Sequence, residues 1–154
     1  MLSFYAETEA CGGSCIGFAN RKNYDALLLE MQNRHSGKDL PAGYVRENFY
    51  LCYERSRLIG VLSLKFELTP YLENYGGQIG YAARPSKRRR GWGTQILRGG
   101  PSLAKVLGFS KAPCVCDAGN IASEKIILKN GGKLEDERHA PEENVTVRRY
   151  SIAL

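Results

Sequence analysis

The sequence lacks any long run of apolar residues. No stretch approaches the ~18 consecutive apolar residues that a membrane-spanning helix needs, so we expect no transmembrane helix and no membrane partner. The N-terminal segment MLSFYAETEA also lacks the basic and apolar regions of a secretory signal. Internal repeats and low-complexity tracts are missing too. The sequence therefore predicts one domain over residues 1–154, located in the cytoplasm.

Cysteines are few and odd in number, at positions 11, 15, 52, 114 and 116. Without an export signal, reduced thiols are the expected state, because the cytoplasm is reducing. A zinc site would require Cys11 and Cys15 to meet Cys114 and Cys116, and C-x3-C with C-x-C is not a typical zinc spacing. We therefore expect no metal.

Acidic residues are outnumbered, 16 Asp and Glu against 22 Lys and Arg, which gives a formal charge of +6. This balance favours an anionic partner: nucleic acid, a membrane surface or a phosphorylated small molecule. Charge alone does not rank these three.

Apolar spacing predicts helices over residues 20–35, 91–108 and 120–132. Asn20 or Asn23 is the expected N-cap of the first helix, and Asn120 is the expected N-cap of the last. The second helix contains Gly99, Gly100 and Pro101. A kink or a break is expected there, because proline inside a helix costs ~3 kcal/mol or more.

Strands are expected where apolar, aromatic and β-branched residues cluster between turn signals. They cover residues 48–54, 57–68, 78–83, 112–117 and 145–154. The first two form a hairpin through the short polar turn at Arg55 and Ser56. The order α-β-β-β-α-β-α-β predicts a mixed sheet with helices on its faces, an α/β or α+β architecture.

The segment RPSKRRRGWGTQIL, residues 84–97, joins a predicted strand to a predicted helix through four consecutive basic residues and two glycines. A helix start presents unpaired N–H groups and partial positive charge, and glycine allows close approach of a ligand, so phosphate is favoured. Two familiar phosphate loops are excluded: G-x-x-x-x-G-K-[ST] is missing, and GWGTQI is not G-x-G-x-x-G. A solvated loop or a nucleic-acid patch is the alternative interpretation of KRRR.

The spacing Arg88-x-x-Gly91-x-Gly93 resembles the [Q/R]-x-x-G-x-[G/A] signature of the GNAT superfamily of acyl-CoA N-acyltransferases. DAGNIASEKIILKNGGKLE, residues 117–135, resembles the family's later block of strand, asparagine, helix and Gly-rich end. GGQIGYAARPS, residues 76–86, is similar to a subgroup of bacterial predicted acetyltransferases. The resemblance covers roughly residues 40–154. It implies a mostly antiparallel central sheet flanked by helices, and acetyl transfer from acetyl-CoA to an amine of a small molecule.

The resemblance also implies a role for each matching position. Backbone groups of Tyr81 and Ala83 would pair with the pantetheine arm of acetyl-CoA, and Asn120 and Ser123 would contact the pantetheine or the departing thiol. Trp92 would contact the cofactor or anchor its helix in the core. The pyrophosphate would be held by backbone N–H groups of the segment 88–94, assisted by the Arg88 side chain and the Thr94 hydroxyl. This segment consists of Arg88, Arg89, Arg90, Gly91, Trp92, Gly93 and Thr94.

Acetyl transfer needs a donor for the thioester oxyanion and an acid for the leaving thiolate. In GNAT proteins the oxyanion donor is a strand N–H, here at Tyr81 or Ala83. Many relatives carry an acid tyrosine seven residues after the asparagine, and that position is Ile127 here. Ser123 or a water molecule is therefore the expected acid, the alternative being that protonation of the thiolate needs no side chain.

The reaction also needs a base, because the attacking amine must be neutral. Gln78 stands where the subgroup often carries histidine, and an amide cannot act as a base. The remaining candidates on the acceptor side are Glu67, Glu73 and Tyr71. We favour Glu67, because it is expected to end a strand beside the cofactor strand.

GNAT proteins usually begin with a strand and a helix, whereas only the short segment 1–11 precedes the Gly-rich GGSCIG here. The first strand is therefore expected to be missing, and an exposed sheet edge favours a homodimer. Two alternatives stay open: a catalytically impaired acyl-CoA-binding module, and a basic nucleic-acid-binding protein. We expect no specific nucleic-acid partner.

Overall fold

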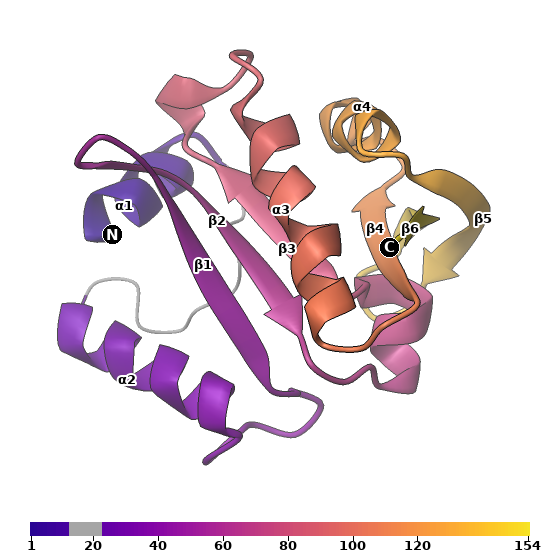
Figure 1. The fold of residues 1–154 in the computed structure, drawn as a ribbon, viewed down its shortest axis with the longest axis horizontal. Helices are drawn as coiled ribbons and strands as arrows, with labels where there is room; N and C mark the ends of the chain where they lie inside the picture. Colours follow the sequence, from indigo (N-terminus) through magenta and orange to yellow (C-terminus); the bar gives the residue numbers. More distant parts are fainter. Residues whose placement is uncertain (13–22) are drawn as a thin grey trace.

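The computed structural model describes residues 1–12 and 23–154, whose strands form two antiparallel three-stranded sheets (Figure 1). The first sheet has the order β1-β2-β3, and the second has the order β4-β6-β5. The strands are β1 Glu47–Glu54, β2 Arg57–Lys65, β3 Ile79–Ala83, β4 Lys111–Asp117, β5 Lys133–Ala140 and β6 Val145–Ala153.

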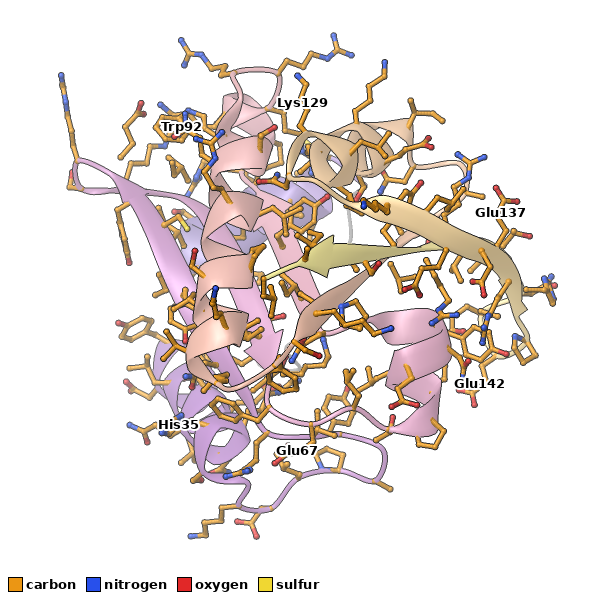
Figure 2. The ribbon with its side chains drawn as sticks, turned by 45° about the vertical axis from the view of Figure 1, so that its right-hand side comes forward. His35, Glu67, Trp92, Lys129, Glu137 and Glu142 are labelled. Atoms are coloured by element: carbon orange, nitrogen blue, oxygen red, sulfur yellow. The ribbon has the colours of Figure 1, made fainter. Side chains whose placement is uncertain are left out.

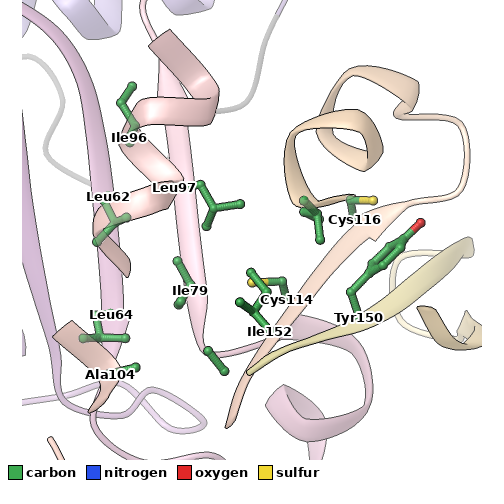
Figure 3. Close-up of a cluster of buried hydrophobic side chains, with 12 residues drawn as sticks. Leu62, Leu64, Ile79, Ile96, Leu97, Ala104, Cys114, Cys116, Tyr150 and Ile152 are labelled. Atoms are coloured by element: carbon green, nitrogen blue, oxygen red, sulfur yellow. The ribbon is translucent and has the colours of Figure 1, made fainter. Parts of the chain in front are cut away.

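The two sheets join at one point. The Gln78 N–H donates to the Pro113 carbonyl at 2.8 Å, so the starts of β3 and β4 lie side by side. From this junction the two strands diverge, as Figure 3 shows around Ile79 and Cys114. The divergence leaves one edge of β3 open along most of its length, and this open edge positions the site described below.

Helices cover both faces of the first sheet (Figure 1). α3, Trp92–Val106, packs on the face that carries Leu62 and Leu64, and these side chains belong to the larger buried cluster (Figure 3). α1, Leu2–Ala10, and α2, Tyr24–Ser36, pack on the opposite face around Val61. α4, Ile121–Lys129, follows β4 and contributes the buried Ile127.

The helix predicted over residues 20–35 is confirmed from Tyr24 onward. The side chain of Asn23 accepts a hydrogen bond from the Ala26 N–H at 3.1 Å, which makes it the N-cap. Gly37, with φ of 81°, ends the helix in the left-handed conformation that glycine adopts without strain. The alternative cap, Asn20, lies outside the described residues.

The predicted break at residues 99–101 is wrong, because α3 runs unbroken past Pro101, whereas the predicted kink stays a prediction. Proline removes the hydrogen bond to the Leu97 carbonyl, but the helix is held by its buried face. Gly100 fits tightly against the sheet, where an added Cβ would lie 2.9 Å from Ile79 Cδ1. Tertiary packing therefore outweighs local propensity here.

β5, α1 and two short helices, the π-helix Leu72–Gly76 and the 3-10 helix Pro85–Lys87, were not predicted. β5 has the sequence KLEDERHA, whose charged residues give no apolar alternation, because β5 is an edge strand exposed on much of its surface. α1 was not expected either, yet Phe4 and Tyr5 are buried under the first sheet. The strand predicted over residues 57–68 ends earlier, at Lys65. Within the described residues no strand precedes Glu47. Residues 13–22 lie outside the described residues, so the loss of the first strand stays a prediction.

An internal ion pair fastens α1 to the loop that follows β3. Arg84 is 3% exposed, and its guanidinium donates to the Leu58 carbonyl and to Glu7 Oε2, each at 2.6 Å. The other oxygen of Glu7 accepts the Ser86 N–H at 2.7 Å. Burial disfavours ionised Glu7, but hydrogen bonds from Ser86 and Arg84 outweigh it and lower the pKa of this carboxyl to about 2. α1 therefore supports the first residues of the basic segment.

Candidate functional site

Residues 88–94 comprise the turn that precedes α3 and the first three residues of that helix. Arg89 and Gly91 have positive φ angles of 58° and 83°, which turn the chain from a short 3-10 helix, Pro85–Lys87, into α3. Among the described residues, the backbone N–H groups of positions 89–94 donate to no protein group. Unpaired N–H groups at a helix start, with exposed arginines around them, make a site for an anion.

The two glycines of this segment, Gly91 and Gly93, have different structural roles. An added Cβ at Gly91 would meet no atom within 4 Å, so this position leaves space beside the helix start. At Gly93 an added Cβ would lie 2.6 Å from Ile126 Cδ1, so this glycine lets α3 approach α4. Trp92 is partly buried against the larger core cluster, as expected for an anchor of the helix.

The open edge of β3 presents backbone groups of Tyr81 and Ala83. The Arg84 N–H donates to the Ile59 carbonyl of β2. Because successive residues of a strand direct their backbone groups to alternate sides, residues 81 and 83 direct theirs away from β2. These are the positions that the sequence predicts for the pantetheine arm.

The side chain of Tyr81 extends from β3 to α4 and contacts Ser123 there. The Tyr81 hydroxyl lies 2.6 Å from Ser123 Oγ and donates to the Ser123 carbonyl at 3.2 Å. Asn120 caps α4 as predicted, since its side chain accepts the Ser123 N–H at 3.0 Å. Burial raises the pKa of the Tyr81 phenol, although the hydrogen bond with Ser123 lowers it, so this hydroxyl stays protonated near neutral pH.

A pocket of about 360 Å³ lies on the other face of the first sheet. Ser63 and Lys65 of β2 point into it, because they alternate with Leu62 and Leu64, which face α3. Gly80 also lines the pocket and pairs in register with Ser63. Since glycine has no side chain, the pocket reaches the backbone of β3 directly beside Tyr81.

Charged groups are buried in the wall of this pocket. Glu47 of β1 is 4% exposed, and its Oε1 accepts a hydrogen bond from Arg34 Nη1 at 2.5 Å. Lys65 Nζ lies 4.0 Å from Glu47 Oε2. Burial lowers the pKa of Lys65, and the nearby positive charge of Arg34 lowers it further. The negative charge of Glu47 acts in the opposite direction, but the net effect is a lowered pKa. Sequence reasoning missed both residues, although each is a charged residue at an inward position of an otherwise apolar strand.

The predicted base is not brought to this pocket. Glu67 lies beyond the end of β2, and its side chain is 45% exposed. Nη2 of the Arg46 guanidinium lies 2.5 Å from Glu67 Oε1. Figure 2 places Glu67 at the opposite end of the molecule from Trp92. Tyr71 does line the pocket, but burial and a hydrogen bond to Glu143 raise its pKa to about 12. Glu73 is exposed and does not line the pocket.

Within residues 1–12 and 23–154, no group of three or more His, Cys, Asp or Glu side chains could hold a metal ion. The four described cysteines are free thiols, and Cys15 lies outside the described residues. In the same part of the chain, no helix has the length and apolar character needed to cross a membrane.

No protein-family profile and no curated protein sequence matches the chain. Its fold is similar to several solved structures. RimL, the ribosomal L7/L12 alpha-N-protein acetyltransferase in complex with coenzyme A, superposes with a TM-score of 0.70 at 18% identity, over 99% of this chain and 86% of RimL.

Two further solved structures are similar over 99% of this chain. Spermidine N-acetyltransferase SpeG of Vibrio cholerae gives a TM-score of 0.63 at 15% identity, over 89% of its own chain. MccE, the microcin C7 self-immunity acetyltransferase in complex with acetyl-CoA and AMP, gives 0.67 at 16% identity, over 84% of its chain. The chain therefore has the fold of the GNAT acetyltransferases.

Proposed function

We propose that this protein is an N-acetyltransferase that moves the acetyl group of acetyl-CoA to the amine of a small molecule. The observation that carries this proposal is the joint placement of a candidate anion site and an open strand edge. The unpaired N–H groups of residues 89–94 follow β3 in the chain, and the backbone groups of Tyr81 and Ala83 point away from β2, with the Ala83 carbonyl accepting a hydrogen bond from Arg88 Nε at 3.4 Å.

On this proposal, the donor lies along the opening between β3 and β4. The N–H groups of residues 89–94, with Arg88 and the Thr94 hydroxyl, bind the pyrophosphate, because a helix start and its cations favour a phosphate. The arm pairs with the edge of β3 as an added strand would. A strand N–H at Tyr81 or Ala83 then faces the thioester oxygen and stabilises its developing charge.

The acceptor amine enters from the pocket of about 360 Å³, which lies on the face of the first sheet opposite α3 and is lined by Gly80 of β3. Here we assign the base to Glu47 rather than Glu67. Glu47 lines the pocket, and its Oε2 atom makes no hydrogen bond to a described residue. This carboxylate oxygen can therefore receive a proton from the acceptor amine. The amine nitrogen then attacks the thioester carbon, and the carbon–sulfur bond breaks as the tetrahedral intermediate collapses.

The leaving thiolate takes a proton from Ser123, and the Tyr81 hydroxyl, 2.6 Å away, passes its own proton to Ser123. Solvent then returns a proton to Tyr81. This pair supplies the hydroxyl that relatives carry at the position of Ile127. Tyr81 reaches the same space from β3, and its pKa, raised by burial, keeps it a donor.

Binding of acetyl-CoA tests the proposal. Saturating acetyl-CoA is expected to raise the Tm by about 5–10 °C, because a hundredfold excess over Kd stabilises the folded state by about 2.7 kcal/mol. Pantetheine, which lacks the pyrophosphate, should give a much smaller rise. Gly91→Val should abolish most of the acetyl-CoA shift, because it strains a residue with φ of 83° and fills the space beside the helix start.

The matched control is Gly99→Val, an exposed position of the same helix with no neighbour within 4 Å of an added Cβ. It should keep the native shift. A native protein that does not respond to acetyl-CoA contradicts the proposal. A shift with duplex DNA that coenzyme A does not reverse, and that falls steeply with salt, would favour the nucleic-acid interpretation of the basic segment.

Substitutions at the hydroxyl pair are expected to be non-additive. Ser123→Ala should lower kcat about tenfold to a hundredfold, because the thiolate loses its proton donor. Tyr81→Phe should have a smaller effect, and the double variant should be no slower than Ser123→Ala, because Tyr81 acts through Ser123. Steady-state release of coenzyme A measures all three, with exposed Tyr53→Phe as the control. Effects that multiply would mean that the two hydroxyls act independently.

We further propose a cytoplasmic location and a homodimer. Free thiols at Cys11, Cys52, Cys114 and Cys116 suit a reducing compartment. Within the described residues, β1 is an edge strand that pairs only with β2, and a second copy could cover that edge. Analytical ultracentrifugation measures the oligomeric state directly.

A further inference from the structure

Lys65 is a partly buried cation whose ammonium makes no hydrogen bond within the described residues. Its side chain is 18% exposed and lines the pocket, and it makes no hydrogen bond to another described residue. The nearest carboxylate oxygen, Glu47 Oε2, is 4.0 Å away. An ammonium has three N–H donors, and leaving them unpaired in a buried place is costly. A ligand oxygen in the pocket would remove this cost.

Glu47 offers the complementary group. Its Oε1 is occupied by Arg34, but Oε2 makes no hydrogen bond to a described residue. Two unsatisfied groups of opposite charge therefore face the same pocket, one a donor and one an acceptor.

Among the described residues, the charged groups around the pocket balance. Arg34 binds both Glu47 and Glu30, at 2.5 Å and 2.8 Å, so its charge is already matched. Lys65 adds one positive charge, and together the four groups sum to zero. A ligand that carries several charges of one sign, such as a polyamine, would leave some of them unmatched in a buried place. A ligand with one charge of each sign fits.

We infer that the pocket takes a zwitterionic amino compound, an α-amino acid, whose amine contacts Glu47 and whose carboxylate contacts Lys65. This inference rests on the proposed function, because it names the substrate class of the same acceptor pocket. The amine and the carboxylate of an α-amino acid are separated by only one carbon, so they can bridge two groups that lie 4.0 Å apart. Charge-assisted hydrogen bonds of about 2.7–2.9 Å then form on both sides.

The position of the pair also suits the transfer. Lys65 lies on β2 next to Gln78, whose carbonyl accepts the Lys65 N–H at 3.1 Å, and Gly80 opens the pocket to β3 two residues later. An amino acid held between Glu47 and Lys65 therefore lies in the pocket that reaches the backbone of β3 at Gly80. The side chain of the amino acid extends toward Tyr44 and Leu72, which line the same pocket.

Matched acceptor pairs test the inference. We compare kcat/KM for leucine and 3-methylbutylamine, and for tyrosine and tyramine, because the members of each pair differ only in the carboxylate. The native enzyme should prefer each amino acid by about tenfold or more, since a site with a buried polar group rejects ligands that leave it unpaired. Lys65→Met should bring that preference ratio close to one. Lys105→Met, at an exposed lysine of α3, should keep the native ratio.

Calorimetric titration of leucine without acetyl-CoA separates the two levels of the proposal. Binding to the native protein and its loss in Lys65→Met, with both proteins folded by their melting curves, supports the pocket assignment even where no acceptor is acetylated. Absence of acetyl-CoA binding would remove the proposed function alone. Equal affinity of native protein and Lys65→Met for leucine, or a preference for the amines or for spermidine, overturns the inference.

Discussion

Glu7→Gln is expected to lower the free energy of unfolding at pH 7 by about 2–3 kcal/mol. The substitution removes the charge that faces the buried guanidinium of Arg84 and weakens the acceptor of the Ser86 N–H. For a chain of this size the loss corresponds to a fall in Tm of about 5–10 °C. Urea unfolding followed by circular dichroism measures it, and Glu142→Gln at an exposed carboxylate is the control.

The effect must depend on pH in one direction. The pKa of Glu7 is about 2 in the folded state, below the ordinary value of 4.5, so folding favours the ionised form. Its contribution is complete above pH 4.5 and is lost as pH falls toward 2. The native protein and Glu7→Gln should therefore converge in stability near pH 2. A difference that stays constant from pH 7 to pH 2 would show that the ion pair does not carry it.

Glu47→Gln is expected to lower kcat/KM for acetylation by about a hundredfold, because general-base assistance is typically worth 10²–10⁴-fold. Glutamine keeps a hydrogen-bond acceptor for Arg34 but cannot take a proton. The measurement is coenzyme A release at saturating acetyl-CoA over a range of acceptor concentrations. Melting curves, with and without acetyl-CoA, establish that the variant is folded and still binds the donor.

Glu67→Gln is the matched comparison. It changes the same chemical group at a carboxylate that is half exposed and bound to Arg46, where a surface ion pair contributes little to stability. A large rate loss in Glu67→Gln, with Glu47→Gln close to native, would restore the assignment made from sequence. Equal and small effects at both would leave ordered water as the proton acceptor.

Local signals predicted much of the fold. The hairpin of β1 and β2, the strands β3, β4 and β6, and the helices α2 and α4 each carry an apolar period and a cap or turn within a few residues. β5 carries no such period, because an edge strand can be charged on both faces. α3 misled the local reading at Pro101, because the contact of Gly100 with Ile79 stabilises the helix from outside it.

On the donor side of the candidate site, too, local sequence signals predicted some residues, while tertiary contacts placed others. Segment 88–94 is contiguous, so its glycines and arginines predicted an anion site that the unpaired N–H groups of the structure can form. The partner of Ser123 could not be predicted, because Tyr81 lies 42 positions away in the sequence and meets it only where β3 faces α4. Sequence reasoning therefore placed the serine without its tyrosine.

The sequence by itself determined the fold class and the candidate anion site, because both depend on patterns of residues that are close together along the chain. Only the tertiary structure decided which residues form the proposed acceptor side. Glu47 and Lys65 meet because the β1–β2 register pairs them, and α2 brings Arg34 to their side. Glu67, two residues after Lys65, is turned out to Arg46 once β2 has ended. Contacts set by strand register and by packing across a sheet leave no local pattern, so the choice between these two carboxylates required the folded chain.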